Sequence, residues 1–167
     1  QLKAQWFQAL SSNSNLVLMA KAEMGYLGNY NKYKVSPFER FEVGGDGMSG
    51  YNMYGIDIIS MRGYEDGALD PVGSYSCAYN KYTVELRYPV ILKPSSTIYV
   101  LGFLEGGNAW TDVKDFSPFN LKRSAGAGVR IYLPMVGMMG IDWAYGFDKV
   151  FGVKGGSNFH FILGQEF

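Results

Sequence analysis

Hydrophobic and polar residues alternate along much of this chain, in segments that are separated by turn residues. Alternation with a period of two is the pattern of a β-strand whose two faces meet different surroundings. From Met139 to Phe147, one face carries Met, Ile, Trp, Tyr and Phe, and the other carries Gly, Asp, Ala and Gly. The pattern predicts about eight strands, over residues 3–10, 15–26, 38–44, 81–88, 97–110, 124–133, 139–147 and 159–167.

The polar faces of these strands distinguish between two kinds of all-β protein. A soluble sandwich buries its large apolar residues in a core and turns polar residues toward water. A transmembrane barrel turns apolar residues toward lipid and fills its lumen with small or polar residues. The polar faces here combine Gly, Ser and Ala with single charged residues, and small residues let other segments approach inside a lumen. The pattern therefore favours an all-β fold, an antiparallel transmembrane β-barrel.

Connections between the predicted strands alternate between short and long. Residues 13–15 and 134–137 predict short hairpin turns. Longer loops are expected at residues 27–37, 46–79, 111–122 and 148–157. This order is typical of outer-membrane barrels, in which short turns face the periplasm and long loops face outward.

Composition narrows the possible functions. The 167 residues include 15 basic and 15 acidic residues, so the net charge of 0 gives no reason to expect nucleic acid as a partner. The 13 Tyr, 11 Phe and 22 Gly residues fit strands, turns and aromatic girdles. No apolar run reaches about 18 residues, which excludes a transmembrane helix. The chain begins at Gln1 without a methionine or signal peptide, so we expect a removed signal or a fragment.

The sequence predicts neither an enzyme nor a cofactor site. His160 is the single histidine and Cys77 the single cysteine, and these are too few for a metal cluster. No glycine-rich loop of the phosphate-binding kind occurs. We therefore expect no catalytic residues, no metal ligands and no cofactors, with Cys77 as a small packed thiol.

One motif stands out in the longest predicted loop, Met61-Arg62-Gly63-Tyr64. Glycine lets the backbone turn sharply, while the guanidinium of Arg62 stays available for bidentate pairing. From these residues alone, an ordinary surface arginine explains the motif at least as well.

Two carboxylates, Glu85 and Glu105, lie within predicted strands. Ionised groups at membrane depth rarely face lipid, so both side chains are expected in the lumen. The alternative is a solvated lumenal charge with no special partner, or a pair between Glu85 and Arg87 along one strand.

The last predicted strand ends the chain on an aromatic residue. One of its faces carries Phe159, Phe161, Leu163 and Phe167. A terminal aromatic residue also fits a plain interfacial anchor, so this strand alone does not indicate a function.

Taken in order, these features resemble the BamA-like family of outer-membrane assembly proteins. That family has a Val-Arg-Gly-Phe/Tyr motif at the tip of a long loop that folds back into the barrel lumen, and Met61-Arg62-Gly63-Tyr64 is similar to it. In the family, the arginine pairs with acidic residues of the two strands that follow, and the matching positions are Glu85 and Glu105. Met61 replaces the usual Val, and Glu105 stands where Asp is common.

The resemblance implies where this chain lies in a larger barrel and which residues hold the long loop inside the lumen. Residues 1–167 would be the C-terminal part of a barrel of about sixteen strands, with a long lumenal loop at 46–79 and a closing strand at 158–167. The residues that would lock the loop inside the lumen are Arg62, Gly63, Tyr64, Glu85 and Glu105.

The closing strand would form one side of a seam between the first and last strands of the barrel. Its seam residues would be Phe159, Phe161, Leu163, Gly164 and Phe167. Its edge would serve as a template for incoming strands, and Gly164 would weaken pairing near the seam because it has no side chain.

The implied function is assembly and insertion of β-barrel proteins into the bacterial cell outer membrane. The expected partners are outer-membrane lipids, unfolded β-barrel client proteins, and accessory lipoproteins or other subunits of an assembly complex. A related two-partner secretion barrel or a TamA-like translocation barrel is an alternative within the same superfamily. A small structural or porin-like barrel is another, since about eight strands can close into a filled barrel. A lipid-modifying barrel enzyme is a weaker alternative, because His160 has no suitable Ser or Asp arrangement.

Overall fold

The computed structural model describes residues 1–10, 15–28, 36, 38–48, 55–71, 74–93, 96–135, 137–152 and 155–164. Within these residues the fold is all-β, with a main antiparallel sheet of seven strands in the order β1-β2-β5-β6-β7-β8-β9. Their bounds are β1 Leu2–Ala9, β2 Val17–Tyr26, β5 Ala78–Lys93, β6 Ser96–Trp110, β7 Lys122–Leu133, β8 Gly137–Gly146 and β9 Ser157–Leu163. A short 3₁₀ helix, η1 (Val113–Asp115), lies between β6 and β7.

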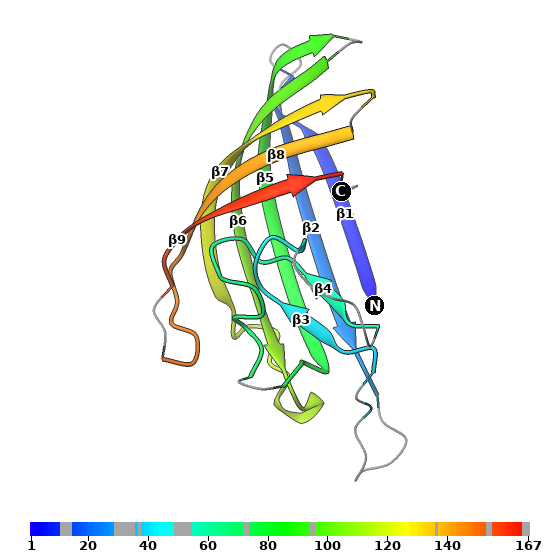
Figure 1. Ribbon diagram of the computed structural model, residues 1–167, viewed down its shortest axis with the longest axis vertical. Helices are drawn as coiled ribbons and strands as arrows, with labels where there is room; N and C mark the ends of the chain where they lie inside the picture. The colour runs from blue at the N-terminus through cyan, green and yellow to red at the C-terminus, as the bar shows by residue number, and fades with distance from the viewer. Residues whose placement is uncertain are drawn as a thin grey trace.

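Neighbours in the main sheet follow each other along the chain, apart from one insertion between β2 and β5. This up-and-down order is the order of a membrane barrel. The sheet is curved and strongly twisted, and β1 and β9 form its two edges among the described strands (Figure 1). The sheet is therefore an open arc of a barrel wall.

The insertion between β2 and β5 packs on the concave side of this arc (Figure 1). It contains β3 (Phe41–Val43) and β4 (Asp57–Ile59), which pair in parallel in a sheet of their own. An apolar cluster joins the insertion to the barrel wall, and its buried members are Phe41, Val43, Ile59, Met61, Tyr64, Leu69, Tyr79, Ala109 and Val150. The insertion thus shares a small apolar core with the wall.

The structure changes one part of the strand prediction. Residues 38–44 count among the predicted wall strands, but β3 belongs to the insertion, so seven described strands form the wall. Phe41 and Val43 alternate with Glu42 as in any half-buried strand, and alternation does not reveal which sheet a strand joins. Most of the predicted turn at 13–15, most of the predicted loop at 27–37 and Phe167 lie outside the described residues.

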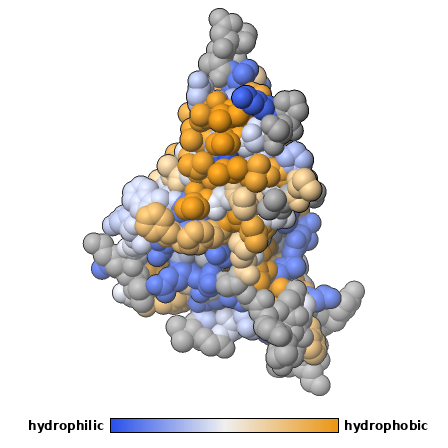
Figure 2. Space-filling model, turned by 45° about the horizontal axis from the view of Figure 1, so that its top comes forward, coloured by the Kyte–Doolittle hydropathy of each residue, from blue (hydrophilic) through white to orange (hydrophobic). Residues whose placement is uncertain are grey.

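The two faces of the wall reverse the arrangement of a soluble protein. Large apolar side chains are exposed on the convex face, among them Val84, Leu86, Leu104, Val129, Ile141, Trp143, Phe159, Phe161 and Leu163. Figure 2 shows a continuous hydrophobic patch on one face, with hydrophilic residues gathered below it. Charged side chains are buried on the concave face, among them Glu85, Glu105, Arg130 and Asp142. Apolar outside and charged inside is the pattern of a transmembrane barrel, which confirms the predicted fold class.

The search for membrane-spanning helices gave a separate result. In the described ranges, no helix is both long and apolar enough to cross a membrane.

Candidate functional site

The candidate site lies where the tip of the insertion meets the concave face of the wall. Arg62 follows β4 closely, and its side chain is only 8% exposed. Its Nη2 atom lies 2.6 Å from Oε1 of both Glu85 on β5 and Glu105 on β6. The backbone N–H of Arg62 donates to the other carboxylate oxygen of Glu105, at 2.9 Å. Glu105 therefore holds both the main chain and the side chain of the tip.

The register of β5 and β6 explains why these carboxylates converge. Glu105 pairs with Thr83, two residues before Glu85, so both carboxylates project from the concave face on adjacent strands. The structure thus brings together the arginine and the acidic residues that the sequence analysis selects. Their role as a lock remains a proposal.

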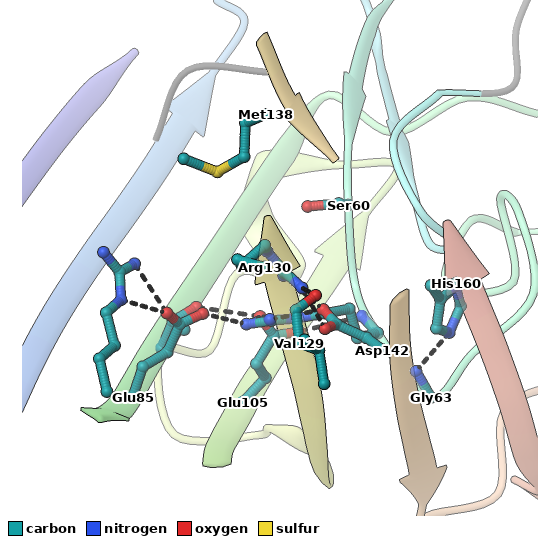
Figure 3. A network of polar contacts seen from close by, with 12 residues as sticks. Ser60, Gly63, Glu85, Glu105, Val129, Arg130, Met138, Asp142 and His160 are labelled. Atoms are coloured by element: carbon teal, nitrogen blue, oxygen red, sulfur yellow. Dashed lines mark hydrogen bonds and ion pairs between the residues drawn. The ribbon is translucent and has the colours of Figure 1, made fainter. Parts of the chain in front are cut away.

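Asp142 on β8 is a further partner of the tip, and the sequence analysis does not select it. Its Oδ2 atom accepts a hydrogen bond from Nη1 of Arg62 at 2.9 Å and one from Nη2 of Arg130 at 2.7 Å (Figure 3). On the other side of Arg62, Glu85 also accepts hydrogen bonds from Arg87, at 2.9 and 2.7 Å.

Acidic and basic groups therefore alternate across the concave face in the order Arg87, Glu85, Arg62, Asp142, Arg130 (Figure 3). Lys81 extends the network at 3.3 Å from Glu105. An unpaired ion in such a buried place is strongly destabilising, whereas alternation gives each of these charges an opposite neighbour. The tip thus depends on partners that come from several strands.

Electrostatics keep Arg62 charged. Burial lowers the pKa of Arg62, but Glu105 and Glu85 more than offset this effect, so its pKa lies above the ordinary value. The guanidinium carbon also lies 3.6 Å from the ring centroid of Phe103, a cation–π contact on the remaining side of the group. Arg62 is therefore enclosed by carboxylates and an aromatic ring.

Gly63 allows the tip to touch the wall closely. Its φ angle is +90°, a conformation that favours glycine. A Cβ atom there would lie 2.9 Å from Cβ of Ser124 and 3.0 Å from the backbone nitrogen of Gly146. Gly146 is constrained from the other side, since its own Cβ would lie 2.5 Å from the carbonyl oxygen of Gly63. The N–H of Gly63 donates to Nε2 of His160 on β9, at 2.9 Å.

Tyr64 completes the tip. Its ring is buried in the apolar cluster of the insertion, and its hydroxyl donates to the carbonyl oxygen of Arg123 on β7, at 2.7 Å. Arg62, Gly63 and Tyr64 together therefore contact strands β5 to β9. The motif joins one loop to most of the described wall.

A second polar anchor lies at the base of the insertion. Asp70 accepts a hydrogen bond from the backbone N–H of Val43 at 2.9 Å and another from the hydroxyl of Ser76. Burial raises the pKa of Asp70 to about 7, although both hydrogen bonds oppose the shift. The charge of this anchor therefore depends on pH near neutrality.

The predicted seam residues have a different environment. The side chains of Phe159, Phe161 and Leu163 are exposed on the convex face of β9. Gly164 follows β9 with a φ of +67°, and its N–H donates to the carbonyl oxygen of Met138. In the described sheet, β9 pairs with β8 alone.

Several residues of the network are not predicted from the sequence, namely Lys81, Phe103, Arg130, Asp142 and His160. A signal for the charged ones exists, because Arg130, Asp142 and His160 each lie on the polar face of an alternating segment. A single ionisable residue on a face of small residues, inside a membrane barrel, indicates a buried partner.

Comparison with known proteins gives two matches. The profile of the Omp85 superfamily domain matches residues 1–167. The chain is also 29% identical over 142 residues to the outer membrane protein assembly factor BamA of Neisseria meningitidis serogroup B. That match covers 76% of this chain and 15% of the relative, so the chain spans a small part of the relative's length. The chain therefore belongs to the Omp85 superfamily, and its sheet is part of a β-barrel in the bacterial outer membrane.

Proposed function

We propose that the protein containing this chain assembles and inserts β-barrel proteins into the outer membrane. The observation that carries the proposal is the tip Arg62-Gly63-Tyr64, which contacts strands β5 to β9 on the concave face. A plain structural barrel has no need for a loop tip with partners on so many strands. The similarity to a protein named as an assembly factor favours assembly over the translocation alternatives within the superfamily.

In this proposal the work is done by strand pairing, without a catalytic residue, nucleotide or metal. A polypeptide entering lipid must satisfy its backbone hydrogen bonds, because each unpaired group there is costly. An exposed strand edge can supply these bonds by β-augmentation. The edge proposed for this role is β9, at the seam of a larger barrel. The partners are then unfolded client barrels, lipids and accessory subunits of an assembly complex.

The tip serves as a lock on the loop in this scheme. Seated on the concave face, it links strands β5 to β9, so that the seam strand is presented from a fixed wall. Releasing the tip leaves three buried carboxylates, Glu85, Glu105 and Asp142, with one cation fewer each, and removing a charge partner in a buried site is destabilising.

The test is Arg62→Ala in the full-length protein, with assembly of client barrels as the readout. We expect severalfold less folded client in the outer membrane. The matched control is Lys114→Ala, because Lys114 is an exposed basic residue of η1 that lies outside the network. Normal client levels, together with unchanged heat-modifiability of the Arg62→Ala protein, would contradict the proposal.

A further inference from the structure

Two residues that face each other across the last strand pair hold two consecutive residues of the tip. Asp142 on β8 and His160 on β9 are partners in the antiparallel register. Asp142 accepts a hydrogen bond from the Arg62 side chain, and His160 accepts one from the Gly63 N–H (Figure 3). Both are buried on the concave face. The tip therefore contacts the edge strand itself through the imidazole of His160.

The hydrogen bond from Gly63 defines the protonation state of the His160 imidazole. An imidazole nitrogen that accepts a hydrogen bond carries no proton, so Nε2 of His160 is unprotonated in this structure. An imidazolium ion has two N–H donors and no acceptor, and it cannot receive the Gly63 N–H. Protonation of His160 would place a donor against a donor and a cation near Arg62.

The surroundings of His160 allow protons to reach it. The charged groups around the imidazole are Asp46 and Arg62 of the insertion, Glu105 of β6 and Asp142 of β8. Beside them lies a cavity of about 90 Å³, lined by residues that include Asp46, Ser60, Arg62 and His160. A polar space of this size can hold water.

Strand β9 is an edge of the described sheet. It is seven residues long and pairs there with β8 alone. Its convex face carries Phe159, Phe161 and Leu163, which are exposed. On its concave face, His160 accepts the hydrogen bond from the Gly63 N–H, which links the strand to the loop tip.

We propose that His160 is a positioning residue that couples the seated loop tip to the edge strand β9, and that protonation of His160 uncouples them. The loop tip would then hold the edge strand firmly at neutral pH and loosely in acid. One consequence of this inference rests on the proposed function: the state of the loop controls the β9 edge that is offered to client strands. The coupling itself is a physical property of the barrel.

The experiment is hydrogen–deuterium exchange of the full-length protein folded in phospholipid vesicles, at about pH 8 and about pH 5.5, on either side of the usual histidine pKa. The readout is the protection factor, the ratio of intrinsic to measured exchange rate at the same pH, for peptides that contain Gly63 and β9. We expect protection in both peptides to fall about tenfold from the higher to the lower pH, the effect of losing one buried hydrogen bond.

Three variants separate the imidazole from its surroundings. His160→Gln can place an amide oxygen near the position of Nε2 and does not titrate, so it should keep protection high at both pH values. His160→Leu has no acceptor and should show low protection at both. Ile141→Val, on the exposed convex face of the neighbouring strand β8, should follow the wild type.

High protection of Gly63 in His160→Leu at the higher pH would overturn the proposal, because the contact would then not hold the tip. A fall in protection in His160→Gln equal to that of the wild type would also overturn it, since another group would be titrating. The wild-type comparison needs no variant, so misfolding of His160→Leu leaves the test intact. These readouts do not involve clients, so they can succeed or fail independently of the client assay with Arg62→Ala.

Discussion

The two faces of β6 follow opposite rules at neighbouring positions. Glu105, on the concave face, is buried and accepts hydrogen bonds from both the side chain and the backbone N–H of Arg62. Leu104, one residue earlier, lies on the convex face with 61% of its surface exposed. The concave position requires a specific partner in a specific register, whereas the convex position requires only an apolar side chain that faces lipid.

This difference indicates where sequence changes matter in such a wall. A substitution on the convex face alters the contact of one side chain with lipid. Substitutions on the concave face alter a network in which Arg62 links Glu85, Glu105 and Asp142. Matched variants on the two faces should therefore differ widely in their effect on stability, and equal effects would contradict this difference between the faces.

The largest difference is expected between Glu105→Gln and Leu104→Val. Glu105→Gln leaves the buried cations Arg62 and Lys81 short of a negative partner, which should lower the free energy of unfolding by about 3 kcal/mol or more. Leu104→Val keeps an apolar side chain toward lipid and should change it by about 0.5 kcal/mol at most. Urea unfolding in vesicles measures both. Equal effects would mean that the network contributes no more than ordinary surface packing.

A pair of glycines gives the next test. Gly63→Ala adds a methyl group at a φ of +90° and against Ser124 and Gly146, so we expect a cost of about 1 to 3 kcal/mol and an unseated tip. Gly102 lies on the convex face of β6, and a methyl group added there would have its nearest neighbouring atom 4.0 Å away. Gly102→Ala should therefore change stability by about 0.5 kcal/mol or less. Protease digestion of the loop reports whether the tip is seated, and a resistant Gly63→Ala loop would contradict the expectation.

These positions also show which features of the site can be predicted from the sequence. The alternation of apolar and polar residues is a local property, and it correctly separates Trp143 from Asp142. The tip and its first two carboxylates can be selected because they match a family motif. The choice of Asp142 and His160 as partners depends on the register of β8 and β9, which brings them to residues 80 and 97 positions away in the chain.

The insertion is less predictable for a related reason. Its strands β3 and β4 pair in parallel and pack on Tyr79 and Ala109 of the wall, and no period in the sequence marks such a contact. Phe103 is similar, because its segment is apolar on both faces and the pattern does not reveal the guanidinium that its ring contacts. The alternation pattern can therefore predict which face of a strand a residue lies on. Predicting its contact partner requires the register of the folded strands.

A smaller difference is expected between two phenylalanines. Phe103→Leu keeps an apolar side chain under Arg62 but removes the ring face that the guanidinium contacts at 3.6 Å, at a cost of about 1 kcal/mol. Phe161→Leu, on the convex face of β9, should cost clearly less, because no cation–π contact is lost there. Urea unfolding again provides the measurement, and a Phe161→Leu effect as large as that of Phe103→Leu would count against the cation–π contact.

A pH response of opposite sign distinguishes the base of the insertion from its tip. The pKa of Asp70 is raised to about 7 in the folded protein, above its ordinary value of 3.8, so its stabilising contribution is fully present below about pH 4. That contribution is lost as pH rises through about 7, because ionising the buried carboxyl is then required. The base should loosen with rising pH, whereas the tip at Gly63 should loosen with falling pH if His160 couples it. Exchange of the Val43 amide, which donates to Asp70, reports the base. Asp70→Asn should abolish the pH dependence at Val43 and leave that at Gly63 unchanged, and a common response of both amides would mean that the insertion moves as one unit.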